Sequence, residues 1–376
     1  MNVDSLLLAD PDLDDLTATV DEVVDAWAGD ARQYYMGRGG PVRELYRELG
    51  RRDLLALSWP RELGGAGRPP SFEYTLWNRL AYRRATRPEL GATIVARVLM
   101  RHGTDEQRAR YLPAIREGLI CFALGYSEPE AGSDLQSVRT RATPVDGGYE
   151  VHGEKVWTSE AHHAEHLWCL CRTGGQDERG RALTLLVVDL DAPGVAVRPI
   201  PTVDGHHVNQ VLLDGVHVAE SARIGAEGEA WAIVREGLAA ERHLQFMPGR
   251  VRRDLEDLVD LCRRSGVLER GEVKQRLARL AARVAAAEAS AAANVLEAQS
   301  GAISPVSAAC TKLLGSALAQ EIADAAFETC GPAASSQVEI SELLWRQARM
   351  ETVAGGSTEM LLGIVARGAL GLGARR

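Results

Sequence analysis

The chain has 376 residues, of which 45% are hydrophobic and 25% charged, a composition typical of folded globular proteins with two or three domains. Its formal net charge of −9 argues against binding to nucleic acid or to an anionic membrane surface. No apolar run approaches the ~20 residues that a transmembrane helix needs, and the acidic N-terminus lacks the basic region of a signal peptide. The six cysteines include no second pair at zinc spacing, so we expect reduced thiols, no metal site and a cytoplasmic protein.

The first part of the chain, residues 1–119, has the apolar periodicity of helices. Apolar side chains recur at three- and four-residue steps, which places them on one face of an α-helix. The expected helices cover residues 13–27, 42–49, 72–82, 94–102 and 105–116. A turn-rich segment, WPRELGGAG at 59–67, separates the second helix from the third. We therefore predict a helical domain over this part.

The middle part, residues 120–226, has short alternating apolar runs separated by turn residues, a pattern that predicts β-strands. The expected strands are 138–145, 149–157, 183–190, 195–200, 208–213 and 216–218. Gly147-Gly148 is expected to form a hairpin turn, and Asp214-Gly215 a turn between the last two strands. The set predicts an antiparallel β domain.

The last part, residues 227–376, returns to helical periodicity. The expected helices cover 272–299, 312–329, 339–353 and 361–370, and the longest of them is rich in alanine. The order of the chain is therefore a helical domain, a β domain and a second helical domain, which is an α+β multidomain arrangement.

Three segments rich in small and polar residues lie at the ends of these elements. They are CFALGYSEPEAGSD at 121–134, KVWTS at 155–159 and TVAGGSTE at 352–359. Small residues let the backbone approach a flat ligand closely, and Trp157 offers an aromatic wall. The phosphate-binding patterns GxxxxGK[ST] and GxGxxG are missing, so a nucleotide cofactor would bind without a Rossmann unit.

Together these segments resemble the acyl-CoA dehydrogenase family, FAD enzymes that desaturate acyl thioesters. Five stretches occur in the order of the family: WPRELGGAG, SEPEAGSD, GEKVWTS, RIGAEGEAW and GGSTEM with ARGALGL. The resemblance implies a helical N-terminal domain, a middle antiparallel β-barrel or sandwich and a C-terminal four-helix bundle. It also implies that the cofactor is FAD.

The resemblance further implies which residues contact FAD. In the family, the segment that matches 124–133 lies along the flavin, and residues that match 157–159 pack beside the isoalloxazine ring. Segments near the C-terminus reach FAD, partly across a subunit interface. The implied FAD contacts are Leu124, Tyr126, Ser127, Gly132, Ser133, Trp157, Thr158, Ser159, Gly331, Ser357 and Glu359.

The position of the general base in this chain differs from its position in many members of the family. These place a catalytic Glu directly before the Gly of the terminal motif, where this chain has Gly355. One branch instead places it on the first helix of the C-terminal domain, immediately before an Arg, and Glu241-Arg242 matches that arrangement. We expect Glu241 to be the base, with a solvated helix face as the alternative, and the Gly355 N–H to bind the thioester carbonyl. Ser133, Leu238 and Arg242 are expected to contact the substrate.

The resemblance also sets expectations about substrate and partners. The substrate would be an acyl-CoA or an acyl group on a carrier protein, and the motifs resemble a branch that acts on bulky chains, including steroid side chains. The electron acceptor would be an electron-transfer flavoprotein or similar protein, and the assembly a homodimer, a homotetramer or a heteromer. Pro332 replaces a Gly of the family, and 268–280 lack its Phe-Gly. Two alternatives therefore stay open: a non-catalytic subunit of a mixed oligomer, and a flavin oxidase or monooxygenase on the same fold.

Three local features have structural alternatives. Glu128 is expected to fix the turn before Pro129 rather than to act chemically. Trp157 is either a flavin contact or an aromatic packed in the core. The histidines at 162, 163 and 166 are expected to lie in a loop and not to bind metal.

Overall fold

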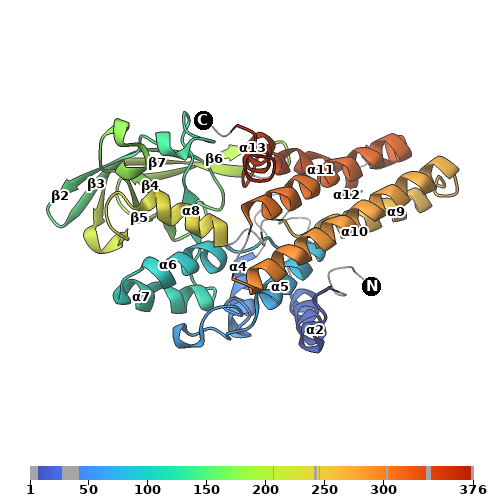
Figure 1. Ribbon diagram of the computed structural model, residues 1–376, viewed down its shortest axis with the longest axis horizontal. Helices are drawn as coiled ribbons and strands as arrows, with labels where there is room; N and C mark the ends of the chain where they lie inside the picture. Colours follow the sequence, from blue (N-terminus) through green and yellow to red (C-terminus); the bar gives the residue numbers. More distant parts are fainter. Residues whose placement is uncertain are drawn as a thin grey trace.

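The computed structural model of the protein describes residues 7–27, 42–205, 207–240, 244, 246–301, 304–335 and 340–373, without the side chains of 239 and 240. Along these residues helices come first, a sheet second and helices third. In Figure 1 the sheet occupies one end of the molecule and the long C-terminal helices extend from the other. The expected α+β arrangement is confirmed.

The N-terminal helices form where apolar periodicity coincides with good end signals. They are α2 (Pro11–Ala26), α4 (Val42–Arg51), α5 (Pro70–Tyr82), α6 (Ala96–His102) and α7 (Asp105–Arg116), with a π-helical turn η2 (Gly91–Val95) leading into α6. α7 begins with a capping box, in which Thr104 Oγ1 accepts from the Gln107 N–H and Gln107 Oε1 from the Thr104 N–H. Trp59 and Trp77 are each 1% exposed and lie in the core beneath these helices.

The middle of the chain forms one eight-stranded sheet. Its strands are β1 (Phe122–Gly125), β2 (Arg141–Val145), β3 (Gly148–Thr158), β4 (His166–Arg172), β5 (Leu183–Asp189), β6 (Val195–Pro201), β7 (His207–Ala219) and β8 (Arg223–Ile224). Their order is β6-β7-β3-β2-β4-β5-β8, and β1 pairs with β4 off this path. The pairs are antiparallel except β1 with β4 and β2 with β4. Every residue of β4 is buried, which makes this strand the centre of the sheet.

Two expectations about the middle part are wrong. Asp214-Gly215 does not separate two strands, because both residues lie inside β7, where the register against β3 shifts between Val151 and Gly153. Gly215, with a φ of +65°, takes up the irregularity as a bulge rather than a turn. His166 is not in a loop: it begins β4 and packs against Tyr111 and Phe122.

The C-terminal helices are α8 (Ala230–Ala240), α9 (Pro248–Arg264), α10 (Gly271–Gln299), α11 (Pro305–Cys330), α12 (Ile340–Glu351) and α13 (Thr358–Gly368). Of these, α9, α10, α11 and α12 pack around an alanine- and leucine-rich core, and α13 lies against α11. α8 lies between β5 and α6, and α9 and α10 both pack on α5 (Figure 1). The sheet and the bundle are therefore joined through the N-terminal helices.

Among the residues that the structure describes, no helix is both long enough and apolar enough to cross a membrane.

Gly50 tests the contact between α4 and the end of α7. A β-carbon at Gly50 would lie 2.4 Å from the carbonyl carbon of Glu117, and this backbone atom cannot rotate away. We predict that Gly50→Ala lowers the free energy of unfolding by about 1–3 kcal/mol through overpacking, although Ala is the better helix former. Urea denaturation measures the change. Gly271→Ala is the control, because a β-carbon there meets no described atom within 4 Å, and equal midpoints for the two variants would contradict the prediction.

Candidate functional site

A buried lysine connects two of the three segments expected to carry chemistry. The Lys155 side chain on β3 is 0% exposed, and its Nζ donates to Glu128 Oε1 and to the Leu170 carbonyl, each at 2.7 Å. A longer contact of 3.4 Å reaches the carbonyl of Tyr126. The ammonium group therefore holds the segment that follows β1 against β3 and β4.

Glu128 supplies the opposite charge and also binds the backbone that leads into β2. Its carboxylate accepts hydrogen bonds from the backbone N–H groups of Arg139 at 2.5 Å and Thr140 at 2.9 Å. Burial raises the pKa of Glu128, but the charge of Lys155 and these hydrogen bonds outweigh it, and the pKa lies below its usual value. The expected structural role of Glu128 is confirmed.

A bulge at the end of β3 displays Trp157 on the surface. The Val156 N–H donates to the Ser127 carbonyl at 2.9 Å, so Ser127 lies beside this strand end. The pairing of β3 with β7 shifts between Lys155 and Thr158, and Trp157 has a φ of +59°. The Trp157 side chain is 61% exposed. This exposure rules out the alternative that Trp157 packs in the core, and it leaves the face of the indole open to a planar partner.

Thr158 and Ser159, which follow Trp157, face different surroundings. Thr158 is 1% exposed, and its Oγ1 has no hydrogen-bond partner among the described residues. Its carbonyl accepts from Asn209 Nδ2 at 2.9 Å, which ties this strand end to β7. Ser159 is exposed. Protein atoms cover the Thr158 hydroxyl, so Ser159 is the residue of this pair whose hydroxyl lies on the exposed side of the strand end.

The remaining expected FAD contacts in the 124–133 segment differ in their exposure. Tyr126 is buried and Leu124 half-buried, whereas Gly132 and Ser133 are exposed on the turn before β2. A β-carbon at Gly132 would meet no described atom within 4 Å, which leaves the space next to this backbone open. The structure therefore brings together Ser127 and the 157–159 segment.

The other expected contacts lie on the C-terminal helices. Gly331 ends α11, and Ser357 caps α13 by accepting from the Met360 N–H at 3.3 Å. Glu359 is exposed in the first turn of α13. None of the described hydrogen bonds connects these residues with the 157–159 segment. If they contact FAD, they contact a different part of it from the part beside Trp157.

Gly355 lies in the loop between α12 and α13. Its φ is +66°, a conformation that glycine adopts readily and a side chain rarely does. None of the described residues accepts a hydrogen bond from the Gly355 N–H. Lys312 Cε would lie 3.7 Å from a β-carbon at Gly355. The position thus presents a backbone donor and would strain a side chain.

The expected base and one expected substrate contact fall outside the described residues. Glu241 and Arg242 directly follow α8, and the description of the chain stops at residue 240. Leu238, which precedes them on α8, is half-buried.

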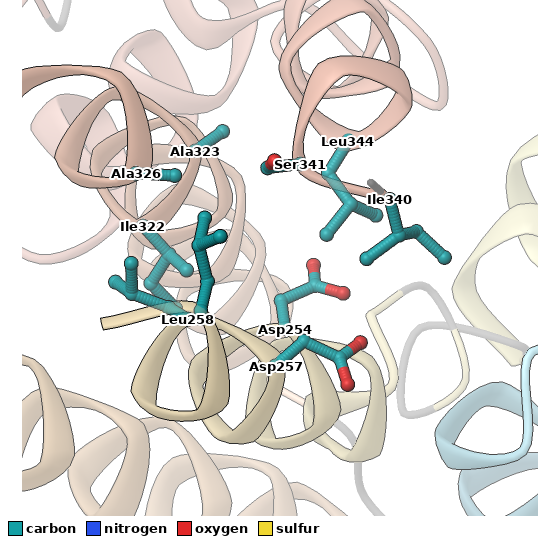
Figure 2. A pocket seen from close by; sticks show the side chains of 10 residues that line it. Asp254, Asp257, Leu258, Ile322, Ala323, Ala326, Ile340, Ser341 and Leu344 are labelled. Carbon is teal, nitrogen blue, oxygen red and sulfur yellow. The ribbon is translucent and has the colours of Figure 1, made fainter. Parts of the chain in front are cut away.

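One small cavity lies away from these segments, between α9, α11 and α12. Its volume is about 20 Å³, room for about one water molecule. Figure 2 shows the carboxylates of Asp254 and Asp257 on one side and apolar side chains such as Ile322 and Leu344 on the other. Arg84 binds both carboxylates, at 2.6 and 2.5 Å. None of the expected cofactor or substrate residues lines this cavity, which is a packing defect beside an ion-pair network.

The sequence analysis gave no role to the two buried lysines. The chain has 43 basic residues, of which only Lys155, Lys274 and Lys312 are lysines. Two of the three are buried, Lys155 at 0% and Lys312 at 3% exposure. A compact ammonium can donate to oxygens in several directions, whereas the guanidinium of Arg is a planar fork. Because the chain uses arginine for almost all of its basic residues, the presence of a lysine was the sequence signal that could have pointed to these two positions.

Lys155 tests the connection between β3 and the 121–134 segment. Removing one partner of a buried ion pair leaves an uncompensated charge, so we predict that Lys155→Met lowers the free energy of unfolding by about 3–5 kcal/mol. Lys274→Met is the matched control because Lys274 and its partner Glu269 are exposed, and a surface change of this kind stays within about 0.5 kcal/mol. Thermal denaturation of both variants measures the difference, and similar midpoints would contradict the prediction.

The same pair predicts a pH dependence. The folded pKa of Glu128 lies below its unfolded value of about 4.3, so its contribution is present above that pH and disappears as the pH falls through the folded pKa. The stability gap between the wild type and Lys155→Met should therefore narrow when the pH falls from about 6 to about 3.5. A gap that widens on acidification would overturn this assignment.

Models of three domains match the chain in order. The N-terminal domain of acyl-CoA dehydrogenase matches residues 10–118, the middle domain 123–216 and the C-terminal domain 228–370. Among curated relatives, acyl-CoA dehydrogenase FadE26 of Mycobacterium tuberculosis is 31% identical over 359 residues, which cover 89% of each chain. FadE29 of the same organism is 36% identical over 215 residues, covering 57% of this chain and only 56% of that relative.

Solved structures agree over almost the whole length. A structure described as "Tcur3481-Tcur3483 steroid ACAD" has a TM-score of 0.91 at 31% identity and covers 98% of this chain and 99% of its own. The ChsE4-ChsE5 complex from Mycobacterium tuberculosis has a TM-score of 0.89 at 29% identity, with 96% and 98% covered. With all three domain models matched and the fold shared, the chain is an oxidoreductase that belongs to the acyl-CoA dehydrogenase family.

Proposed function

We propose that the protein carries out the FAD-dependent α,β-dehydrogenation of an acyl thioester. The observation that carries this proposal is the end of β3. There the exposed Trp157 stands on a bulge beside Ser127, and the exposed Ser159 follows two residues later. An aromatic face, backbone carbonyls and an exposed hydroxyl-bearing residue suit a flat, polar-edged ring such as a flavin.

These residues fit FAD, and they define its proposed site. Leu124, Tyr126, Ser127, Gly132, Ser133, Trp157, Thr158 and Ser159 would hold the ring system, while Gly331, Ser357 and Glu359 would hold more distant parts of the cofactor. Gly132 favours this because the space beside its backbone is open to the described atoms. When bound, FAD would supply the acceptor for the β-hydrogen, which leaves the substrate as a hydride.

The chain itself would supply the acid–base chemistry. The α-proton of a thioester is weakly acidic, and a carboxylate positioned beside it can accept the proton. Glu241 is the proposed base. The charge that develops on the thioester oxygen needs hydrogen-bond donors, and the Gly355 N–H, which no described residue occupies, is the proposed one. Ser133, Leu238 and Arg242 would position the acyl thioester.

The proposed substrate is an acyl-CoA, with a carrier-protein thioester as the competing form. Because a relative described as a steroid ACAD is 31% identical over nearly the whole chain, a steroid-derived acyl-CoA is the first bulky acyl group to test. An electron-transfer flavoprotein is the proposed acceptor, and the proposed setting is cytoplasmic. Oxygen as the acceptor would make the protein an oxidase on the same fold.

A second candidate function is a non-catalytic subunit of a mixed oligomer. Pro332 and the missing Phe-Gly at 268–280 favour it, because both changes fall where the family contacts FAD. The ChsE4-ChsE5 relative was solved as a complex of two differently named chains. In this reading a partner chain would be needed before FAD binds, whereas the lead proposal allows a homodimer or homotetramer.

Glu241 tests the lead proposal in the FAD-loaded protein. Anaerobic addition of acyl-CoAs of several sizes should bleach the visible absorption of the wild-type flavin. We predict that Glu241→Gln retains bound FAD but bleaches about 10²–10⁴-fold more slowly, because general base catalysis is lost. Glu236→Gln, also from the α8 region, is the control, since Glu236 pairs with His102 at 2.9 Å and has no proposed catalytic role.

The outcomes separate the candidates. Full activity of Glu241→Gln would disprove the base assignment. A protein that takes up no FAD, alone or after addition of cofactor, would favour the mixed-oligomer subunit. If none of the acyl-CoAs bleaches the bound FAD but a carrier-protein thioester does, the substrate is the carrier-protein thioester.

Trp157 tests the flavin contact separately from turnover. Truncating an exposed aromatic that stacks on a ring removes contact area and stacking, so Trp157→Ala should weaken FAD binding about tenfold, equivalent to about 1.4 kcal/mol. Equilibrium dialysis of the apoprotein against FAD measures it. Trp345→Ala is the control, because Trp345 is 38% exposed on α12 and pairs with Asp324. Equal affinities for the two variants would remove Trp157 from the site.

A further inference from the structure

The last residue of α12, Glu351, lies at the centre of a network of basic side chains. Arg250 on α9 donates to Glu351 Oε1, and Arg87, in the segment between α5 and η2, lies 3.4 Å from the same oxygen. Glu351 is 13% exposed and Arg250 8%. A buried carboxylate with two cations from different parts of the chain fixes where α12 ends relative to both.

Lys312 on α11 fixes the backbone at the same point. Its Nζ donates to the Glu351 carbonyl at 2.7 Å, and its side chain is 3% exposed. The preceding turn of α12 is also tied to α11, because Gln320 Nε2 donates to the Ala348 carbonyl at 3.1 Å. The side chain and the carbonyl of Glu351 are therefore held separately, by different elements.

The Glu351 carboxylate at the centre of this network keeps its charge across the ordinary pH range. Burial raises the pKa of Glu351, but Arg250, Arg87 and Lys312 together lower it to about 2. A second ion-pair set supports Arg250, whose Nε lies 3.8 Å from Asp254, and Asp254 also binds Arg84 at 2.6 Å. The N-terminal helices, α9 and α12 are thus joined through paired charges.

The loop that carries Gly355 begins directly after Glu351. It is closed at its far end by the Thr358 N–H, which donates to the Thr352 carbonyl at 2.9 Å. Between these two points, none of the described residues accepts from the Gly355 N–H, and Lys312 Cε is 3.7 Å from the position of a β-carbon on Gly355. The network therefore acts on the same short loop as the proposed thioester donor.

We infer that Glu351 and Lys312 are positioning residues that aim the Gly355 N–H at the thioester oxygen of the substrate. This inference rests on the proposed function, because it concerns the same donor. A loop whose donor is held by tertiary contacts does not need to reorganise when charge develops on the substrate oxygen. A misplacement of about 1 Å at such a donor can cost about 10²-fold in rate, so a residue that touches no substrate can still control it.

The test compares two glutamates of α12 in the FAD-loaded protein. Glu351→Gln weakens the pairs with Arg250 and Arg87, while Glu342→Gln weakens a half-buried pair with Arg346 on the same helix. Hydrogen–deuterium exchange is measured over residues 350–360. We expect Glu351→Gln to speed exchange of this loop about tenfold or more through local opening, and Glu342→Gln to leave it unchanged.

A second readout reports the donor itself. An acyl-CoA analogue carrying ¹³C at its thioester carbonyl is bound, and the infrared shift of that carbonyl is recorded. The shift should shrink in Glu351→Gln, with kcat lowered about 10–100-fold and KM changed by less than about threefold. Lys312→Met should have the same effects, and Lys312→Arg should restore part of the carbonyl shift because it keeps a buried cationic donor.

The outcomes distinguish the two proposals. If no thioester bleaches the flavin of the wild-type protein, the proposed function is contradicted. Hydrogen–deuterium exchange of the loop then decides alone whether Glu351 and Lys312 hold the loop. If wild-type turnover is found but folded Glu351→Gln keeps both the wild-type exchange and the wild-type carbonyl shift, the inference is overturned. An equal effect of Glu342→Gln would overturn it as well, because helix stability would then explain the result. Should Glu351→Gln fail to fold, Lys312→Met and Lys312→Arg decide by the same readouts.

Discussion

A buried ion pair between Lys155 and Glu128 holds together the two segments on which the candidate flavin site depends. Lys155 is a residue of β3, and Glu128 belongs to the turn that leads from β1 towards β2. Two charges without water are stable only when their remaining donors and acceptors are satisfied. Here the Leu170 carbonyl and two backbone N–H groups meet that requirement. β1 fixes the first part of the 121–134 segment by pairing with β4, and the ion pair fixes the turn that follows β1.

The end of β3 shows how a sheet can present a functional side chain without losing its core. The end of β3 pairs with β7, and Val156 is 9% exposed, so the strand itself is anchored. The bulge before Thr158 interrupts the regular pairing of β3 with β7. At this bulge Trp157 takes a left-handed φ that costs free energy. The neighbouring contacts, from Val156 to Ser127 and from Asn209 to Thr158, maintain this conformation.

Paired charges also join the parts of the fold. Arg84 bridges the N-terminal helices to Asp254 and Asp257 on α9, and Arg250 links α9 to Glu351 on α12. The charge-assisted hydrogen bonds of a buried ion pair fix both the distance and the direction between two elements, in addition to what close apolar packing fixes. The proposed thioester donor lies in the loop that this network anchors, so under the proposed function the contacts that join the helices would also position that donor.

The sequence by itself determined the order of helices, strands and helices, because period-3.6 and period-2 apolar patterns and turn residues are local signals. It also determined the family, through motifs such as SEPEAGSD and GGSTEM that lie in one order along the chain. Only the tertiary structure decided that Asp214-Gly215 is a bulge, that Trp157 is exposed and that Lys155 and Lys312 are buried. Each of these depends on a partner distant in the sequence: β3 for the bulge, Glu128 for Lys155 and the Glu351 carbonyl for Lys312. Register, burial and ion pairing are properties of two segments in contact, which no local pattern specifies.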